Sequence, residues 1–225
     1  QGVEIKKRWF KEMLKKYGSC AKIAYYYRKP VAQILYYPEI ADSTKIWKRE
    51  GVLYIHCIYN PFPEAQRHGI GQPWFNNKPC KFIVADAFNT GEFQPHPIFY
   101  KNRGFKNAYE EAHGGFSKNR MYLEISGNYE PEKSVEEYTP ISEDKGKAVI
   151  FYSPTCQFSY HFSIKVTEII HSITEIQVKL INAWEMPEEA IKRKNHWLIV
   201  NAKSIKTSFF EKEKFMEEIR EALSN

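Results

Sequence analysis

The chain has 225 residues, of which 43% are hydrophobic and 16% aromatic, so it can build one large core or two small ones and is too apolar to be disordered. Its formal net charge of +6 is spread over short clusters of lysine and arginine, which is more typical of solvated faces than of a nucleic-acid surface. The longest apolar runs are of strand length, far short of the ~20 residues of a membrane span. We therefore expect no nucleic-acid partner and no membrane partner.

The beginning of the chain shows no sign of export. Residues 1–17 are charged and amphipathic, unlike a secretory signal, and the missing initiator methionine indicates a processed or incompletely represented N-terminus. The four cysteines, Cys20, Cys57, Cys80 and Cys156, stand far apart, and none forms half of a zinc motif. We expect reduced thiols, no metal and a cytoplasmic location.

The first 130 residues predict a mixture of helices and strands. Apolar residues four positions apart predict a helix over residues 5–17, which Gly18 ends. A short helix is predicted over 96–102. Strand patterns occur at residues 21–27, 31–37, 51–59, 81–88 and 121–126. The first two strands should form a hairpin that turns at residues 28–30, and strand 81–88 is apolar enough to be buried in the middle of a sheet.

A linker rich in proline and charge, residues 131–145, separates a first domain, 1–130, from a second, 146–225. The elements predicted for the second domain are strand 148–152, helix 157–173, strand 176–182, helix 187–194, strands 197–201 and 205–209, and helix 211–223. This β-α-β-α-β-β-α order is a thioredoxin-like arrangement. The expected fold class is α/β (α+β), with the first domain followed by a small thioredoxin-like α/β domain.

The most informative segment follows the strand 51–59. Its sequence is Gln66-Arg67-His68-Gly69-Ile70-Gly71. Glycine has no Cβ, so the backbone N–H groups of such a turn can converge on an anion, and a helix that begins there adds the positive end of its dipole. The segment therefore predicts a site for a phosphate or pyrophosphate group.

These residues resemble the acetyl-CoA signature of the GNAT acetyltransferase superfamily, Q/R-x-x-G-x-G/A after the fourth strand, with Gln66, Gly69 and Gly71 at its defined positions. Residues 99–105 resemble a second motif of the superfamily, F-Y-x-x-x-G-F. The resemblance implies a GNAT mixed sheet flanked by helices and an N-acetyltransferase with acetyl-CoA as donor, in which Tyr100 protonates the departing CoA thiolate. The acceptor amine, on a small molecule or a protein, is not fixed by these motifs.

The resemblance covers roughly residues 3–126. Segments such as 29–34 and 85–93 are similar to a bacterial and archaeal subgroup that carries a C-terminal YoaP-like extension. The resemblance implies that the backbone at the end of strand 51–59 pairs with the pantetheine arm, and that Arg67 and His68 donate backbone N–H groups. The implied cofactor-binding residues are Cys57, Ile58, Tyr59, Gln66, Arg67, His68, Gly69, Ile70, Gly71 and Asn89.

The chain departs from the superfamily pattern in two places. A helix of a dozen or more residues should follow Gly71, yet Pro73 lacks an N–H and no helical periodicity follows it. Either residues are omitted at this point, which we favour, or the pyrophosphate site is impaired. The strand and helix that normally precede residue 5 are also missing.

The general base is not assigned by the motifs. Many members of the superfamily place a glutamate on the fourth strand, but residues 52–58 contain no carboxylate. His56 is one candidate, because an unperturbed imidazole titrates near neutrality. Asp86 and Glu92 are further candidates that the spacing does not support.

Cys156 is the second candidate catalytic residue. Residues 156–159, Cys-Gln-Phe-Ser, follow a strand and begin a helix, like the C-x-x-S site of thioredoxin-like proteins, where a helix N-terminus makes thiolate available. Because Ser159 excludes an internal disulfide, we do not expect dithiol oxidoreductase chemistry. Two alternatives to the acetyltransferase stay open: a monothiol thioredoxin-like redox or binding protein, and a catalytically silent acyl-CoA sensor.

Overall fold

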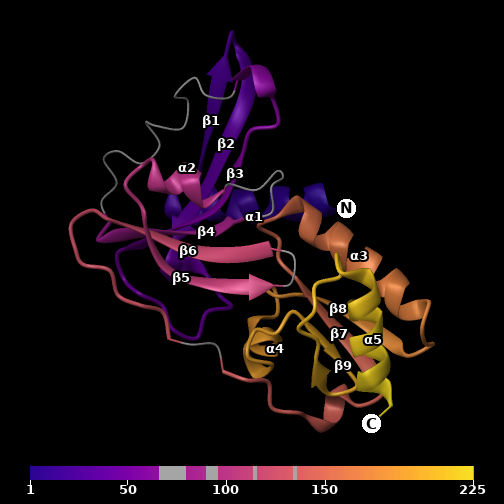
Figure 1. The fold of residues 1–225 in the computed structure, drawn as a ribbon. Helices are drawn as coiled ribbons and strands as arrows, with labels where there is room; N and C mark the ends of the chain where they lie inside the picture. The colour runs from indigo at the N-terminus through magenta and orange to yellow at the C-terminus, as the bar shows by residue number, and fades with distance from the viewer. Residues whose placement is uncertain (66–79, 90–95, 114–115, 134–135, 225) are drawn as a thin grey trace. The chain divides into compact units, whose positions relative to one another are not determined.

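The computed structural model describes residues 1–65, 80–89, 96–113, 116–133 and 136–224, which form two compact units (Figure 1). The six-stranded unit consists of Phe10–Ala41 and Lys48–Glu132. The four-stranded unit consists of Gln1–Trp9, Asp42–Trp47 and Lys133–Asn225. Both units combine helices with a mixed sheet, so the chain is an α/β protein.

The sheet of the six-stranded unit has the strand order β1-β2-β3-β4-β6-β5. All neighbours are antiparallel except β3 and β4, which are parallel. The strands are β1 (Ala21–Tyr26), β2 (Lys29–Pro38), β3 (Val52–Tyr59), β4 (Phe82–Phe88), β5 (Lys106–His113) and β6 (Phe116–Glu124). The strands predicted at 21–27, 31–37, 51–59 and 81–88 are thereby confirmed.

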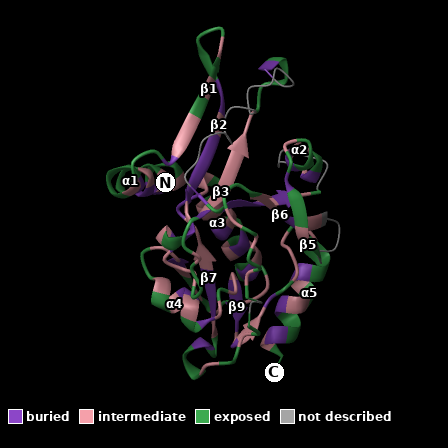
Figure 2. Ribbon diagram, turned by 90° about the vertical axis from the view of Figure 1, so that its left-hand side faces the viewer, coloured by how far each residue is buried: buried purple, intermediate pink, exposed green. Residues whose placement is uncertain are grey.

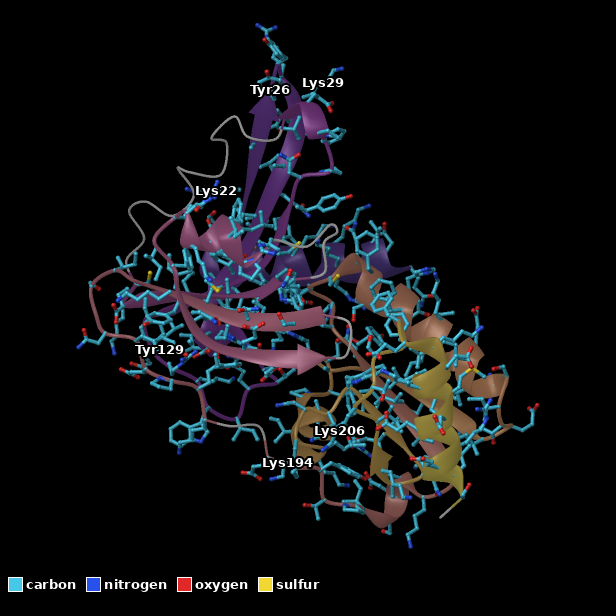
Figure 3. The ribbon with its side chains drawn as sticks, viewed as in Figure 1. Lys22, Tyr26, Lys29, Tyr129, Lys194 and Lys206 are labelled. Carbon is cyan, nitrogen blue, oxygen red and sulfur yellow. The ribbon has the colours of Figure 1, made fainter. Side chains whose placement is uncertain are left out.

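The predicted hairpin of β1 and β2 turns earlier than expected. Its turn is Tyr27 and Arg28, with φ of 45° and 65°, and it closes on the pair of Tyr26 with Lys29 (Figure 3). Two positive φ values in a two-residue loop match the right-handed twist of the flanking strands. The prediction of a turn at 28–30 was wrong. Pro30 lies in β2 instead of the turn, because proline is tolerated near the start of a strand.

The hairpin of β5 and β6 was largely missed by the sequence patterns. β5 was not predicted, and β6 begins well before the expected strand 121–126. β5 is an edge strand with one solvated face, so its charged residues hide any apolar alternation. Cross-strand ion pairs hold the hairpin, with Lys106 lying 2.9 Å from Glu124 and Lys118 lying 3.4 Å from Glu111.

Two apolar clusters cover the two faces of this sheet, because alternate side chains of a strand point to opposite sides. On what we call the helix face, Ile55, Ile83 and Ala85 pack with Tyr100 of helix α2 (Pro97–Lys101). The opposite side, which we call the tyrosine face, carries Val52, Phe82, Val84, Tyr54, Tyr122 and Tyr129. Figure 2 shows β2 buried along much of its length, whereas the tip of the β1–β2 hairpin is exposed.

The predicted helix over residues 5–17 is confirmed as α1 (Gly2–Tyr17). Its buried side chains, Ile5, Trp9 and Met13, lie four residues apart, as expected of one apolar face. Gly18 follows with φ of 71°, the left-handed conformation that commonly ends a helix.

The four-stranded unit has the sheet order β10-β9-β7-β8, in which β7 and β8 are parallel and β9 is antiparallel to β7. Its elements are β7 (Lys147–Tyr152), α3 (Gln157–His171), β8 (Gln177–Asn182), α4 (Pro187–Lys192), β9 (Leu198–Val200), β10 (Lys203–Ser204) and α5 (Lys212–Leu223). The predicted succession of strands and helices is confirmed. α3 and α5 contribute Val166, Ile170, Phe215 and Ile219 to the core on one side of the sheet.

The last strand is the one element of this unit that was predicted wrongly. β10 is short and precedes the expected strand 205–209, because Asn201 and Ala202, with φ of 47° and 58°, form a two-residue turn directly after β9. Ile205 packs in the core instead of continuing a strand.

Residues 136–144 of the expected linker form ion pairs and hydrogen bonds with the four-stranded unit. Glu136 and Glu137 pair with Lys194 and Lys206, which Figure 3 labels. Further along, the Tyr138 hydroxyl donates to the Asp144 carboxylate at 2.8 Å. Asp144 is fully buried and lies 2.6 Å from Nη2 of Arg193, which is itself only 2% exposed.

Candidate functional site

The parallel strands β3 and β4 pair over a short stretch only, from Val52 with Phe82 to Ile55 with Ala85. Beyond it, β3 continues beside β2 and β4 continues beside β6, but no further pair joins β3 to β4, and the two strands diverge (Figure 1). We call the two strand ends that separate here, residues 56–59 of β3 and 86–88 of β4, the wedge. Strand edges that lack a partner strand present backbone N–H and C=O groups, and open α/β sheets bind ligands at the carboxyl ends of parallel strands.

A β-bulge lies where the wedge begins. Leu35 of β2 pairs with Cys57, and the next residue, Tyr36, pairs with Ile55, so His56 is an extra residue in β3. A bulge bends its strand and increases the local twist. Because Ile55 is also the last residue that pairs with β4, the bulge explains why β3 leaves β4 at this point.

The extra residue also decides which side chains share a face. Ile55 and Ile58 both pack in the cluster of the helix face. His56 and Cys57, which lie between them, are therefore left on the tyrosine face. The His56 ring lies 6.0 Å from the ring of Tyr54 and 6.2 Å from that of Tyr37, which supports this placement.

Helix α2 is positioned by residues at both of its ends. At the start, Nδ1 of His96 accepts a hydrogen bond from the N–H of Ile98, and Nε2 lies 2.9 Å from Oδ1 of Asn89. Since Nδ1 is an acceptor, Nε2–H donates a hydrogen bond to Oδ1 of Asn89. At the far end, Gly104 has φ of 84°, a conformation that glycine adopts at little cost. Asn89 thus ties the end of β4 to the helix that carries Tyr100.

Tyr100 is 1% exposed and packs edge to face against Phe105. Burial raises the pKa of its hydroxyl, and electrostatic interactions with Asp86 on β4 and Cys57 on β3 raise it further, while Arg103 lowers it. Tyr100 thus interacts with one group from each strand of the wedge. Because its pKa is raised, Tyr100 stays protonated at neutral pH and can donate a hydrogen bond to an anion.

On the tyrosine face, a polar brace joins β3 to β4 where the wedge begins. The Tyr54 hydroxyl donates to Oδ2 of Asp86 at 2.8 Å, and Oδ1 of Asp86 lies 2.8 Å from Nε of Arg120 on β6. Burial, followed by the charge of Asp86, holds the pKa of Tyr54 well above its usual value, so its hydroxyl remains a donor. Asp86 therefore accepts a hydrogen bond on Oδ2, whereas its Oδ1 forms an ion pair with Arg120 without hydrogen-bond geometry.

The brace continues into a partly buried chain of alternating charges. Arg120 lies 2.6 Å from Glu132, and Glu132 also lies 2.8 Å from Arg49. Arg49 ends the chain at Glu39, which is fully buried and lies 2.7 Å away. Sequence reasoning missed all of these partners, because no local pattern links residues from β4, β6 and the loops that flank β3.

The structure describes only some of the residues expected to bind the cofactor. Cys57, Ile58 and Tyr59 pair with β2 on their outer side, so their inner side faces the wedge. Asn89 lies directly after β4. The turn from Gln66 through Arg67, His68, Gly69 and Ile70 to Gly71 lies outside the described residues, and so does Glu92.

Cys156, the other predicted catalytic residue, belongs to the four-stranded unit, where it directly precedes α3. Ser159, the last residue of the C-x-x-S segment, accepts a hydrogen bond from the N–H of Ser153 at 2.9 Å and donates its own N–H to the Cys156 carbonyl. The Ser159 hydroxyl thus holds the loop between β7 and α3.

In the part of the chain that the structure describes, no three His, Cys, Asp or Glu side chains are grouped so that they could hold a metal ion. Within the same residues, no helix combines the length and the apolar character needed to cross a membrane.

No protein-family model matches the chain, and none of the curated proteins is a significant match. Solved structures similar to it include acetyltransferases, among them a protein described as a GNAT-family acetyltransferase. One from Desulfovibrio desulfuricans has 17% identity and a TM-score of 0.40 over 54% of this chain and 80% of that one. An N-acetyltransferase from Staphylococcus aureus Mu50 has 11% identity and a TM-score of 0.36 over 49% and 73%. Aminoglycoside acetyltransferase AAC(6')-Ib, in complex with coenzyme A, has 17% identity and a TM-score of 0.34 over 46% and 65%.

Proposed function

We propose that the chain is an acetyl-CoA-dependent N-acetyltransferase of the GNAT type, and that the wedge of the six-stranded unit is its active site. The observation that carries the proposal is the wedge itself, in which two parallel strands stop pairing at a bulge beside a buried, protonated tyrosine. The turn with Gln66, Gly69 and Gly71 follows β3 in sequence, where a phosphate group of the donor would be bound.

The residues around the wedge suit an extended thioester. The inner backbone edge of Cys57, Ile58 and Tyr59 can hydrogen-bond to the amides of a pantetheine arm, as an added strand would. Acetyl-CoA supplies an acetyl group that is activated as a thioester. Tyr100 donates its proton to the leaving sulfur, a task that requires a group still protonated at neutral pH.

We propose that the four-stranded unit is a thioredoxin-like, YoaP-like extension. Its support is the strand order β10-β9-β7-β8 with a helical crossover between the parallel strands β7 and β8. Cys156 at the start of α3 is the residue of this unit for which we propose a thiol-dependent role.

Calorimetric titration of the purified protein with acetyl-CoA tests the active-site proposal. We expect saturable binding that Gly71→Glu abolishes, because a carboxylate in the turn would repel the pyrophosphate. Asn77→Glu adds the same charge outside the motif and should bind normally. Absence of binding to the wild-type protein would overturn the proposal. Binding without transfer to any of a panel of primary amines would instead identify an acyl-CoA sensor.

A further inference from the structure

This inference concerns the distribution of charge, and it is independent of the proposed acetyl transfer. Lysine and arginine occur in many short clusters, and for that reason we expected no nucleic-acid partner. Acidic residues accompany most of these clusters, but residues 13–38 contain none. Of the net charge of +6, five charges lie in this segment, at Lys15, Lys16, Lys22, Arg28 and Lys29. The rest of the chain is therefore almost neutral, and the excess charge is concentrated in one segment.

The segment forms the end of α1 and the hairpin of β1 and β2, all within the six-stranded unit. Lys15, Lys16, Arg28 and Lys29 are exposed, and Lys22 is partly exposed. Figure 3 labels Lys22 near the base of the hairpin and Lys29 at its tip. Among the residues that the structure describes, no carboxylate forms an ion pair with any of the five. Their charges are therefore available to an external anion.

Large apolar side chains lie between these cations along β1. Ile23, Tyr25 and Tyr27 are 56%, 62% and 84% exposed, and Figure 2 shows the tip of the hairpin in the colour of exposed residues. Alternate residues of a strand share a face, so Ile23 and Tyr25 lie about 7 Å apart on one side, and Tyr27 follows in the turn. Exposed apolar side chains that lie next to one another, unlike scattered ones, mark an interaction site in many proteins.

Rings and cations together favour one kind of partner. A free phosphate or carboxylate would use the cations alone, and an apolar surface would use the rings alone. A single-stranded nucleic acid uses both, because its backbone is anionic and every unpaired base can stack on an aromatic side chain. In a duplex the bases are already stacked on one another and are not accessible to the tyrosines. RNA presents unpaired bases in its loops and at its ends, so it is the source that fits best.

We propose that the β1–β2 hairpin and the end of α1 form a surface that binds single-stranded RNA. This RNA surface comprises Lys15, Lys16, Lys22, Ile23, Tyr25, Tyr27, Arg28 and Lys29. Bases stack on Tyr25 and Tyr27, and the cations contact the phosphates that join these bases. Because stacking and backbone charge are common to all nucleotides, the surface has little preference for sequence.

Fluorescence anisotropy of a labelled oligouridine, about 20 nucleotides long, tests the proposal with the full chain. At about 150 mM salt we expect saturable binding with a Kd between about 1 and 100 μM. The double variant Tyr25→Ala, Tyr27→Ala should bind at least about 10-fold more weakly, because the stacking of two bases is lost. Phe210→Ala removes a ring that is 71% exposed in the four-stranded unit, and this matched control should bind like the wild type.

The salt dependence of the same binding tests the role of the cations. The double variant Arg28→Gln, Lys29→Gln should lower the magnitude of the slope of log K against log salt concentration by about 0.7 for each lost phosphate contact. The double variant Lys145→Gln, Lys212→Gln removes the same charge from exposed positions of the four-stranded unit and should leave the slope unchanged. Because all of these side chains are exposed, the variants should fold and should bind acetyl-CoA like the wild type.

Three results would overturn the proposal. They are absence of saturation by the wild type below about 100 μM, equal losses in the hairpin variants and their controls, and equal affinity for a duplex RNA of the same length. Displacement of the oligouridine by polyglutamate as readily as by unlabelled oligouridine would also overturn it, and would identify an acidic polypeptide as the partner. Acetyl-CoA binding is measured separately, so failure of the RNA proposal leaves the acetyltransferase standing.

Discussion

Tyr100 and Asp86 both bear ionisable groups next to the wedge, but their surroundings give them different chemistry. Tyr100 is enclosed by aromatic rings and close to negative charge, so it holds its proton. Asp86 is held by the Tyr54 hydroxyl and by the Arg120 guanidinium, so it joins β4 to β3 and β6. At this scale the environment of each side chain, more than its type, decides its role.

Replacement of Tyr100 by phenylalanine should separate turnover from binding. We expect kcat to fall about 100-fold, because the CoA thiolate loses its proton donor, while calorimetry gives the same affinity for acetyl-CoA. Since the pKa of Tyr100 is raised, its ionisation should leave no inflection in the wild-type rate below about pH 10. Tyr25→Phe, at an exposed position of β1, is the control. Unchanged turnover in Tyr100→Phe would contradict the acid role.

The buried pair of Glu39 and Arg49 should matter far more to stability than an exposed pair. Glu39→Gln leaves the Arg49 guanidinium, largely buried, without its fully buried partner, and we expect a loss of about 3 kcal/mol in the free energy of unfolding. Lys106→Gln removes the exposed pair with Glu124 and should cost far less, because solvent screens the attraction between exposed charges. Urea unfolding of both variants measures the contrast, and equal losses would argue against it.

Tyr138 should make the four-stranded unit sensitive to alkali. Burial and the hydrogen bond to Asp144 raise the pKa of Tyr138 to about 12, from an ordinary value of 10.0. The folded state therefore holds this proton more tightly than the unfolded state, so the stabilisation is complete below pH 10 and is lost as the pH rises toward 12. Because Tyr138 is partly exposed, we expect about 1 kcal/mol rather than the full value of the shift.

Urea unfolding between pH 9 and pH 12 measures this loss. Tyr138→Phe should show a shallower decline than the wild type over that range, and Tyr160→Phe, in the same unit, should decline like the wild type. Parallel curves for all three proteins would refute the role of Tyr138.

At the scale of elements, the bulge and the brace act together on β3. The bulge turns the strand away from β4 after Ile55, and the Tyr54–Asp86 hydrogen bond holds the two strands together just before that point. The position at which the wedge opens is therefore fixed from both sides.

Loss of the brace should loosen the wedge without removing any group that contacts the donor. In Tyr54→Phe we expect a loss of about 1 kcal/mol in stability, the usual value of one hydrogen bond. We also expect faster amide exchange in Ile55 and Ala85, the last pair of the ladder, and weaker binding of acetyl-CoA by a few-fold. Tyr122→Phe, on the same face, is the control. Unchanged exchange at Ile55 and Ala85 would show that the bulge alone sets the opening.

Much of the element order could be predicted from local patterns, but the wedge could not. The apolar run of β4 and the four-residue spacing in α1 are visible in the sequence, and they gave correct elements. The bulge cannot be recognised in the sequence. An extra residue in β3 is defined only by the register of β3 against β2, which exists in the folded sheet alone. β5 was not predicted for a related reason. Its many charged residues are typical of an edge strand, but in the sequence they look like those of a loop. The brace joins residues that only the folded sheet brings together.

At the scale of the whole molecule, the assignment of residues to units does not follow the order of the chain. Residues 1–9 and 42–47 group with the C-terminal residues in the four-stranded unit. There, Trp9 is 4% exposed and its ring meets that of Trp184 edge to face, with centroids 5.6 Å apart. The four-stranded unit therefore depends on residues at the start of the chain.

Truncation of Trp9 should reveal this dependence. We expect Trp9→Ala to destabilise the four-stranded unit by about 3 kcal/mol, the usual cost of removing a large buried aromatic side chain. Leu14→Ala, at an exposed position of the same helix, should cost less than about 1 kcal/mol. Amide exchange in β7 and β9 reports on this unit alone, and unchanged exchange in Trp9→Ala would contradict the prediction.

The bulge in β3 also suggests how a site of this kind can arise in evolution. A gene one codon shorter, without residue 56, would place Cys57 directly after Ile55 in an unbroken ladder with β2, and Cys57 and Ile58 would keep the faces they have now. Nothing in the core would need to change, yet β3 would run straight and could pair with β4 to its end. Two sequences that differ by one codon can thus give a closed sheet in one case and an open binding site in the other. The insertion of three bases that separates them leaves the core unaltered.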